Sequence, residues 1–500
     1  SLAGLTIPLT FKPRRGSGDT YRGVREQARL QLESRGKSPP LHELLAIEPE
    51  RGLCRLPEPT PGDLFLDLEG DGFAGEDGSG REYLFGVARP DGRYEAVWAF
   101  TDHEERRAFE WVVDTITRAA REHPGMHVYH YAPYEPAAFK RLMGRYATRE
   151  RELDAMLRAG RFVDLYAVVR QALRAGVERY SIKNLEPLYG FERSIALSVA
   201  NHNLKLMEYG LETDMPDSVP VEVRAIVEGY NRDDCVSTLR LHEWLERVRA
   251  ELVASGTEVP RRSLADGAAP VAVDERAQKV DELRARLLAG IPETRSERNN
   301  EQQGRWLLAY TLDYHRREDK ATWWEYFRLC ELAEEDLYDE RAAIAGMTFV
   351  ERVGPVISKR TGKPTKSVVD RYRYPVQEME IDAGDEVWLL DKKRFGKAVA
   401  VDRIQLTIDV EKGPLRAELH PSAMFAFSHV SSEAMEGALS RIGESVAAGR
   451  DAYGAARSLL TGASPRLASG AFDKQPGENV LDFAVRAGSD LIETVLAIQG

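Results

Sequence analysis

The first third of the chain alternates apolar and polar residues in short runs, which is the pattern of β-strands. The segment DLFLDLEGDG (63–72) predicts one strand, and YLFGVA (83–88) and YEAVWAF (94–100) predict two more. The last two are joined by RPDGR, in which the pair Asp91–Gly92 is a strong hairpin signal. We therefore expect three consecutive antiparallel strands.

An amphipathic helix is expected next. Thr101 and Glu104 have the spacing of a capping box, and the apolar residues that follow recur at helical spacing. These apolar residues are Phe109, Val112, Val113 and Ile116. MHVYHY (126–131) predicts a fourth strand, followed by a helix that starts at Glu135 and Pro136. This β-β-β-α-β-α order is similar to that of the ribonuclease-H-like fold, which is an α/β fold.

The pattern divides the chain into six expected parts. They are 1–60, a mixed segment with the Pro-rich exit LPEPTPGD; 61–250, the α/β domain; 251–300, a charged linker that contains a helix; 301–345, a helical segment; 346–411, a small β-barrel; and 412–500, a mostly helical segment that ends in an apolar run. The best barrel strand is RIQLTIDV (403–410), whose alternate apolar residues share one face. These residues are Ile404, Leu406, Ile408 and Val410.

Length and composition narrow the class of protein. With 500 residues the chain is too long for one core, so two to four domains are expected. No apolar run is long enough to span a membrane, and no signal-peptide pattern is present. Cys54, Cys235 and Cys330 lie far apart, which argues against disulfides or a zinc site and fits a reducing cytoplasm. The net charge of -12 speaks mildly against non-specific coating of nucleic acid, although clustered carboxylates also lower it.

Two acidic residues in the first strand are candidates for metal chemistry. Asp67 and Glu69 are two positions apart, so both project from one face of the strand. Like charges on an otherwise apolar strand are costly unless a cation neutralises them. Hard oxygen ligands suit Mg²⁺ or Mn²⁺. Because the motif is short and common, solvated side chains at a strand end remain the alternative.

A second candidate follows the fourth strand. Glu135 stands at the mouth of the next helix, where it could equally be a charge that the helix dipole stabilises. His130, five positions earlier, could be a histidine packed in the strand.

A third candidate lies on a predicted long helix (221–248). Tyr230 and Asp234 are four positions apart, so they lie on one face of that helix. The same face carries apolar residues and should point inward, where a carboxylate needs a partner. We expect Asp233 to be solvated, and Tyr230 could equally belong to the core.

In this order, the three candidates resemble the DEDD exonuclease superfamily, which contains proofreading and RNA-processing exonucleases. Asp67 and Glu69 match its DxE motif, and Tyr230 with Asp234 matches its Yx₃D motif. HYAPYE (130–135) matches Nx₃[FY]D, with His in place of Asn and Glu in place of Asp. FVDLYAVV and YSIKNLEPLYGF resemble the chain between the second and third motifs, where Asp164 would lie close to the site.

The resemblance implies a metal-dependent 3′→5′ exonuclease that uses two Mg²⁺ or Mn²⁺ ions. Its metal ligands would be the four carboxylates of Asp67, Glu69, Glu135 and Asp234. Tyr230 would orient or deprotonate the attacking water, because the position of the alternative histidine is Gly229 here.

Other residues are expected around these ligands. The resemblance places Asp164 and His130 behind the ligands, and a water-mediated metal ligand is the alternative role for Asp164. Lys183 is expected to be a surface lysine, with a substrate phosphate contact as the alternative.

A narrower resemblance is to bacterial fusions of a RecB-like nuclease with a superfamily 1 helicase. It implies that residues 1–60 are the tail of an upstream nuclease module, 301–345 a helical stalk, 346–411 the small barrel beside the motor, and 412–500 the start of the motor. Gly500 would be the first glycine of a P-loop that continues in a longer parent chain. We therefore expect the helicase motor in the same parent chain and no ATP hydrolysis by these residues.

The barrel contains the candidate nucleic-acid contacts. The segment SKRTGKPTKSVVDRYRY (358–374) is expected to be a basic loop, either a phosphate-contacting hairpin or merely solvated. Its basic residues are Lys359, Arg360, Lys363, Lys366, Arg371 and Arg373. Trp323 and Trp324 could stack bases, but helix packing is the preferred interpretation.

The leading hypothesis is an exonuclease that acts on nucleic acid, with the 3′ end of single-stranded DNA favoured. A catalytically weak platform that guides a strand to the motor is the first alternative. A structure-specific endonuclease on the same fold is the second. No base-reading or 2′-hydroxyl-reading motif decides between DNA and RNA.

Overall fold

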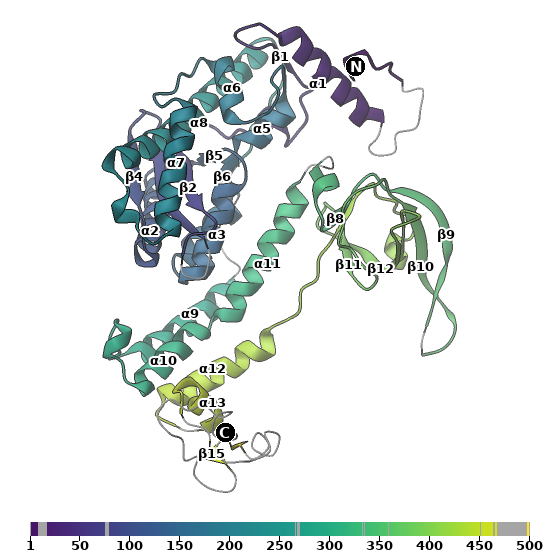
Figure 1. Cartoon of the computed structure of the whole chain (residues 1–500). Coiled ribbons are helices and arrows are strands. Elements are labelled where there is room, and N and C mark those ends of the chain that lie inside the picture. The colour runs from purple at the N-terminus through teal and green to yellow at the C-terminus, as the bar shows by residue number, and fades with distance from the viewer. Residues whose placement is uncertain are drawn as a thin grey trace. The chain divides into compact units, whose positions relative to one another are not determined.

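The computed structural model of the chain describes residues 2–8, 18–75, 80–265, 267, 271–332, 334, 336–358, 360–450, 452–463, 466–467 and 498–499 (Figure 1). It divides into two compact units. The first comprises Ser1–Ala268, Ala333–Gly384 and Gly396–Met424, and the second comprises Ala269–Leu332, Asp385–Phe395 and Phe425–Gly500.

A five-stranded sheet of order β4-β3-β2-β5-β6 forms the centre of the first unit. Its strands are β2 (Leu64–Asp71), β3 (Arg81–Ala88), β4 (Tyr94–Trp98), β5 (Val128–His130) and β6 (Phe162–Asp164). The pairs β2–β3 and β3–β4 are antiparallel, whereas β2–β5 and β5–β6 are parallel. The predicted hairpin is confirmed, since Gly92 turns the chain with a φ of 81°.

Helices surround this sheet in the expected order (Figure 1). They are α2 (Asp102–Glu122), α3 (Tyr134–Tyr146), α4 (Glu150–Ala159), α5 (Leu165–Ala172), α6 (Ile182–Tyr189), α7 (Leu197–Glu212) and α8 (Val221–Ala254). The capping box of Thr101 and Glu104 is confirmed at the start of α2. The helix α8 packs against β2 and β3, and Phe65 on β2 stacks on Tyr129 of β5 within the core.

The core of this domain begins before residue 61. Strand β1 (His42–Leu44) pairs antiparallel with β7 (Leu173–Ala175). The short helix η2 (Gly52–Arg55) buries Leu53 and Cys54 in the same cluster as Phe65. Helix α1 (Gly18–Ser34) precedes β1. The segment before residue 61 therefore supplies part of the hydrophobic core as well as a linker.

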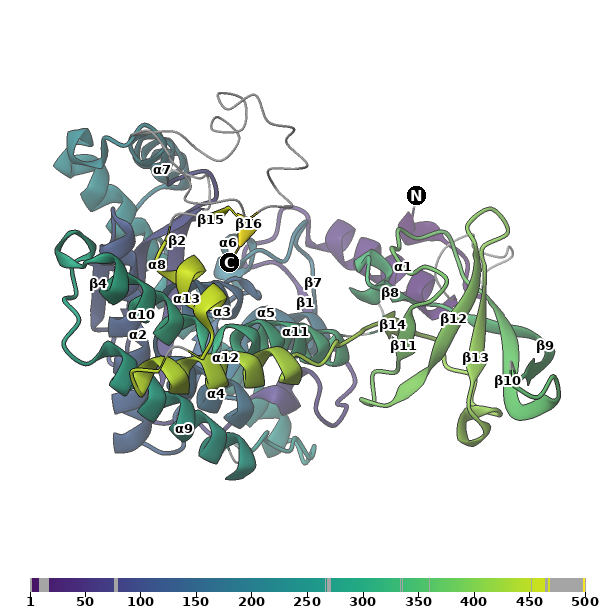
Figure 2. The same ribbon diagram turned by 90° about the horizontal axis from the view of Figure 1, so that it is seen from below.

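A seven-stranded sheet follows, with the order β8-β14-β11-β12-β13-β10-β9 (Figure 2). Its strands are β8 (Ala343–Ile344), β9 (Thr348–Ile357), β10 (Pro364–Arg373), β11 (Glu386–Trp388), β12 (Arg394–Asp402), β13 (Thr407–Lys412) and β14 (Met424–Ala426). The expected closed barrel is not seen among the described residues, because β8 and β9 form the two ends of the order. With only two residues, β8 offers little backbone for a pairing that would close the sheet.

The strand predicted for RIQLTIDV is confirmed in its second half and wrong in its first half. Strand β13 starts only at Thr407, and residues 403–406 form a turn in which Ile404 is 89% exposed. The Asp402 side chain accepts hydrogen bonds from the backbone N–H groups of residues 404 and 405 at 2.9 and 2.8 Å, which favours the turn. Only Ile408 and Val410 are buried as expected.

The second unit is mainly helical. Its helices are α9 (Val271–Leu288), α10 (Asn300–Thr311), α11 (Tyr314–Glu331), α12 (Glu433–Ala447) and α13 (Gly454–Leu460). Leu283, Leu308 and Leu312 share a cluster that joins α9 to α10. Trp324 is buried, and the Trp323 ring lies 5.2 Å from that of Phe427, so both tryptophans contribute to packing.

The expected terminal strand lies mostly outside the described residues. Only β15 (Arg466–Leu467) and β16 (Ile498–Gln499) are described after residue 463, and they pair with each other. Among the described helices, none has the length and apolar character that a membrane crossing requires.

Candidate metal centre

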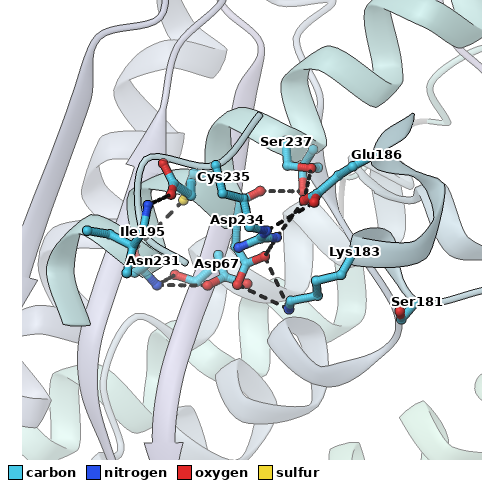
Figure 3. Close-up of polar contacts among 12 residues, drawn as sticks. Asp67, Ser181, Lys183, Glu186, Ile195, Asn231, Asp234, Cys235 and Ser237 are labelled. Carbon is cyan, nitrogen blue, oxygen red and sulfur yellow. Dashed lines mark hydrogen bonds and ion pairs between the residues drawn. The ribbon is translucent and has the colours of Figure 1, made fainter. Parts of the chain in front are cut away.

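The structure brings Asp67, Glu69 and Asp234 together. Each offers a carboxylate oxygen, and these oxygens all lie within 4.8 Å of one another. Asp67 and Glu69 come from one face of β2, as the spacing predicts. Asp234 comes from α8, which packs across β2 (Figure 3). A strand and a helix far apart in the sequence therefore build one acidic cluster.

Burial and mutual repulsion disfavour the charged forms of this cluster. Burial, and then the neighbouring charge of Asp234, raise the pKa of Glu69 to about 8. The same two causes raise the pKa of Asp67 well above its usual range, and Glu69 and Glu135 raise it further. A bound cation would relieve both costs.

Asn231 was not predicted, but it fixes the orientation of Asp67. Its Nδ2 donates to Asp67 Oδ2 at 2.8 Å, and Tyr94 Oη donates to Asn231 Oδ1 at 2.8 Å. Gly86 lies opposite Asp67 in the β2–β3 register, and a Cβ there would clash with Asn231 Oδ1. The sequence signal was a polar residue of low helix propensity in mid-helix, next to Tyr230.

Two cations hold Asp234, and neither was predicted in this role. Arg193 Nη2 donates to Asp234 Oδ1 at 2.6 Å and also to Glu186. Lys183 Nζ lies 3.2 Å from Asp234. Lys183 is therefore not the surface lysine that we expected, because the carboxylate draws it into the site (Figure 3).

The expectation that Asp233 is solvated is wrong. Its side chain is buried and accepts hydrogen bonds from the Ser194 hydroxyl at 2.8 Å and from the Ile195 N–H at 2.9 Å. These bonds anchor the segment that carries Arg193. The inward face of α8 thus includes both neighbouring aspartates.

Tyr230 lies one helical turn before Asp234 and is buried, with 8% of its surface exposed. Lys183 and Arg193 lie over its ring, with Nζ and Cζ at 5.2 and 5.5 Å from the ring centroid. Burial and the charge of Asp234 raise the pKa of its hydroxyl. The hydroxyl therefore keeps its proton at neutral pH.

Glu135 stands slightly apart from the other three carboxylates. It is buried in the first turn of α3 and is not part of the group within 4.8 Å. Its Oε2 has no hydrogen-bond partner and lies 3.5 Å from His130 Nδ1. Burial lowers the pKa of His130, but the carboxylates of Glu135 and Asp164 raise it more, so the net shift is upward. The buried Oε2 of Glu135 could therefore also bind a metal ion.

Asp164 holds the backbone that leads to Glu135. Its Oδ1 accepts hydrogen bonds from the N–H groups of Ala132 and Tyr166, both at 2.9 Å. The second bond caps α5. The first secures Ala132, which has a φ of 73° in the turn between β5 and α3.

The site's donor set fits a divalent metal. Three carboxylates converge, and hard oxygen donors suit Mg²⁺ or Mn²⁺. Oε2 of buried Glu135, which lies 3.5 Å from His130 Nδ1, is a further available oxygen ligand.

The predicted basic segment is part of the hairpin that joins β9 to β10, which is one of the two forms that the sequence left open. Strand β9 ends at Ile357 and β10 begins at Pro364, so Lys366, Arg371 and Arg373 lie on β10. Arg360, Lys363, Lys366 and Arg373 are exposed, and Lys359 lies outside the described residues. Arg371 is engaged by Asp409, with both hydrogen bonds at 2.8 Å.

The comparisons agree with this geometry. Residues 64–246 match the model of the family RNase_H_2 of the RNase_H superfamily, and this segment runs from β2 into α8. A search of curated proteins and a search of solved structures each gave no match. The chain therefore contains a ribonuclease-H-like domain, a superfamily whose members are generally metal-dependent nucleases, and the acidic cluster lies inside it.

Proposed function

We propose that this domain hydrolyses the phosphodiester backbone of nucleic acid with Mg²⁺ or Mn²⁺, as a 3′→5′ exonuclease that favours single-stranded DNA. One observation carries the proposal: Asp67, Glu69 and Asp234 converge within 4.8 Å inside a ribonuclease-H-like domain. The polarity and the strand preference rest on the resemblance of the three motifs to the DEDD exonucleases.

The residues of the chain would divide the work as follows. Bound as a pair, divalent ions would activate the attacking water and stabilise the leaving 3′ oxygen. Asp67, whose carboxylate Asn231 orients, would be the shared ligand. Glu69 and Asp234 would support the nucleophile side, and Glu135 the other side. Tyr230 would orient the water through a hydroxyl that stays protonated.

End-labelled single strands test the activity. The wild type should release the label of a 3′-labelled DNA strand as a mononucleotide in Mg²⁺ or Mn²⁺, and Asp67→Ala and Asp234→Ala should each lower the rate by at least about a hundredfold. Asp217→Ala, at an exposed carboxylate of the same domain, is the matched control and should retain the wild-type rate. A parallel RNA strand measures sugar preference.

Two outcomes would redirect the proposal. Cleavage of a circular single strand would indicate an endonuclease, since an exonuclease needs an end. Binding without metal-dependent cleavage would indicate a platform that guides a strand. Two structural facts make the guiding platform the main competitor. Glu135 lies outside the group of three carboxylates, and Asp234 already pairs with Arg193 and Lys183.

We further propose that the seven-stranded sheet belongs to the helicase portion of a nuclease–helicase and binds nucleic acid through the β9–β10 hairpin. The exposed side chains of Arg360, Lys363 and Lys366 support this contact, because nothing acidic interrupts the segment 358–367. The helicase context rests on the resemblance of the helical stalk and of the sheet to such fusions.

A further inference from the structure

We propose that Lys183 is an exchangeable cation: it pairs with Asp234 while the metal centre is empty and binds a phosphate of the nucleic acid once a metal ion engages that carboxylate. The inference deepens the proposed function and rests on it for the identity of the ligand, a phosphodiester. It assigns Lys183 a substrate contact and Arg193 a positioning role.

The two cations at Asp234 are held very differently. Arg193 is 7% exposed at its side chain and makes a 2.6 Å bond to Asp234 Oδ1, while Nε and Nη2 bond to Glu186 at 3.1 and 2.6 Å. This planar fork is fixed at both ends. Arg193 is therefore the more firmly held of the two cations.

Lys183 has a looser attachment. Its Nζ lies 3.2 Å from each oxygen of Asp234, and its side chain is 30% exposed. A lysine has a flexible stem and three rotatable donors, so it can turn to a new acceptor without moving the backbone. Lys183 can therefore leave Asp234 more readily than Arg193 can.

Charge explains why the exchange would follow metal binding. A divalent ion at Asp67, Glu69 and Asp234 would repel the ammonium group that lies on the same carboxylate. The released group would still lie at the site's edge, above the face of Tyr230 and in the first turn of α6. That position suits an anion, because the start of a helix adds a favourable dipole to the lysine charge. In a nuclease site the available anion is a substrate phosphate.

The exchange predicts effects of opposite sign for Lys183→Met. Because the lysine competes with the metal, the variant should bind Mn²⁺ at least about threefold more tightly in the absence of nucleic acid. Mn²⁺ titration followed by electron paramagnetic resonance measures this affinity. A lysine that merely held Asp234 in place would give weaker Mn²⁺ binding instead.

The same variant should bind single-stranded DNA about tenfold more weakly in Ca²⁺, measured by fluorescence anisotropy on strands recovered intact. The slope of log affinity against log salt should become shallower by about 0.7, the value for one lost phosphate contact on a single strand. In EDTA, where Lys183 stays on Asp234, Lys183→Met should change the affinity for DNA by less than about twofold.

Controls separate this role from folding and from the proposed function. Lys205→Met removes an exposed lysine of α7 in the same domain and should leave all three measurements unchanged. Lys183→Arg keeps the charge and should restore the salt slope. Weaker Mn²⁺ binding, an unchanged slope in Ca²⁺, or equal losses in EDTA and Ca²⁺ would each overturn the exchange. If the wild type does not cleave but these shifts appear, the exchange holds and the proposed hydrolysis fails.

Discussion

At the scale of single residues, the raised pKa of Glu69 makes stability depend on pH and metal together. In the unfolded chain this carboxyl loses its proton near pH 4.5, whereas in the folded, metal-free protein it does so at about 8. The metal-free fold should therefore lose stability as pH rises between these values, because only the unfolded state gives up the proton freely. A divalent ion removes that penalty.

We therefore expect the increase in Tm caused by Mg²⁺ to grow from pH 5.5 to pH 8. Circular dichroism melts in EDTA and in excess Mg²⁺ measure it. Glu69→Gln should weaken the pH dependence in EDTA, since this side chain carries no titrating proton, while Asp67 keeps its raised pKa. A Tm increase that is equal at every pH would contradict the assignment of Glu69 as a ligand.

Residue spacing could predict only those parts of the site that share one element. Asp67 and Glu69 follow from the parity of a strand, and Tyr230 with Asp234 from the turn of a helix. The roles of Asn231 and Arg193 depend on how α8 lies on β2 and on where the segment after α6 returns. Nothing local in the sequence fixes those approaches.

At the scale of elements, the turn between β5 and α3 determines where Glu135 lies. Asp164 bonds to the backbone of this turn and caps α5, so Asp164→Ala should lower the unfolding free energy by about 1–2 kcal/mol. It should also lower the hydrolysis rate, because Glu135 would lose its fixed position. Urea unfolding and Mn²⁺ titration distinguish positioning from ligation.

Asp164→Asn is the informative partner of that variant. An amide oxygen can still accept both backbone hydrogen bonds, so the unfolding free energy should stay close to that of the wild type. The Mn²⁺ affinity should stay within about twofold of the wild-type value. Loss of Mn²⁺ affinity in Asp164→Asn with unchanged stability would instead identify Asp164 as a water-mediated ligand.

Elements also show why part of the second half was mispredicted. The alternation from Ile404 to Val410 has the period of a strand. The Asp402 side chain nevertheless accepts hydrogen bonds from the backbone N–H groups of residues 404 and 405, which favours a turn over residues 403–406. Periodicity reports which face is apolar but not where pairing begins. Closure of a barrel depends on whether the two edge strands pair with each other, and local periodicity does not predict that pairing.

At the scale of the whole molecule, nuclease site and hairpin lie on separate sheets, so their contributions to binding should be separable. Lys363→Ala, at the exposed turn of the β9–β10 hairpin, should make the salt slope for a long single strand shallower by about 0.7. It should leave the hydrolysis rate at saturating substrate unchanged, because the carboxylate cluster is untouched.

Lys397→Ala, an exposed lysine on β12 of the same sheet, is the matched control and should alter neither quantity. Equal slopes for both variants would show that the hairpin does not contact the strand, whereas a loss of the maximal rate in Lys363→Ala alone would mean that the hairpin takes part in positioning the scissile phosphate.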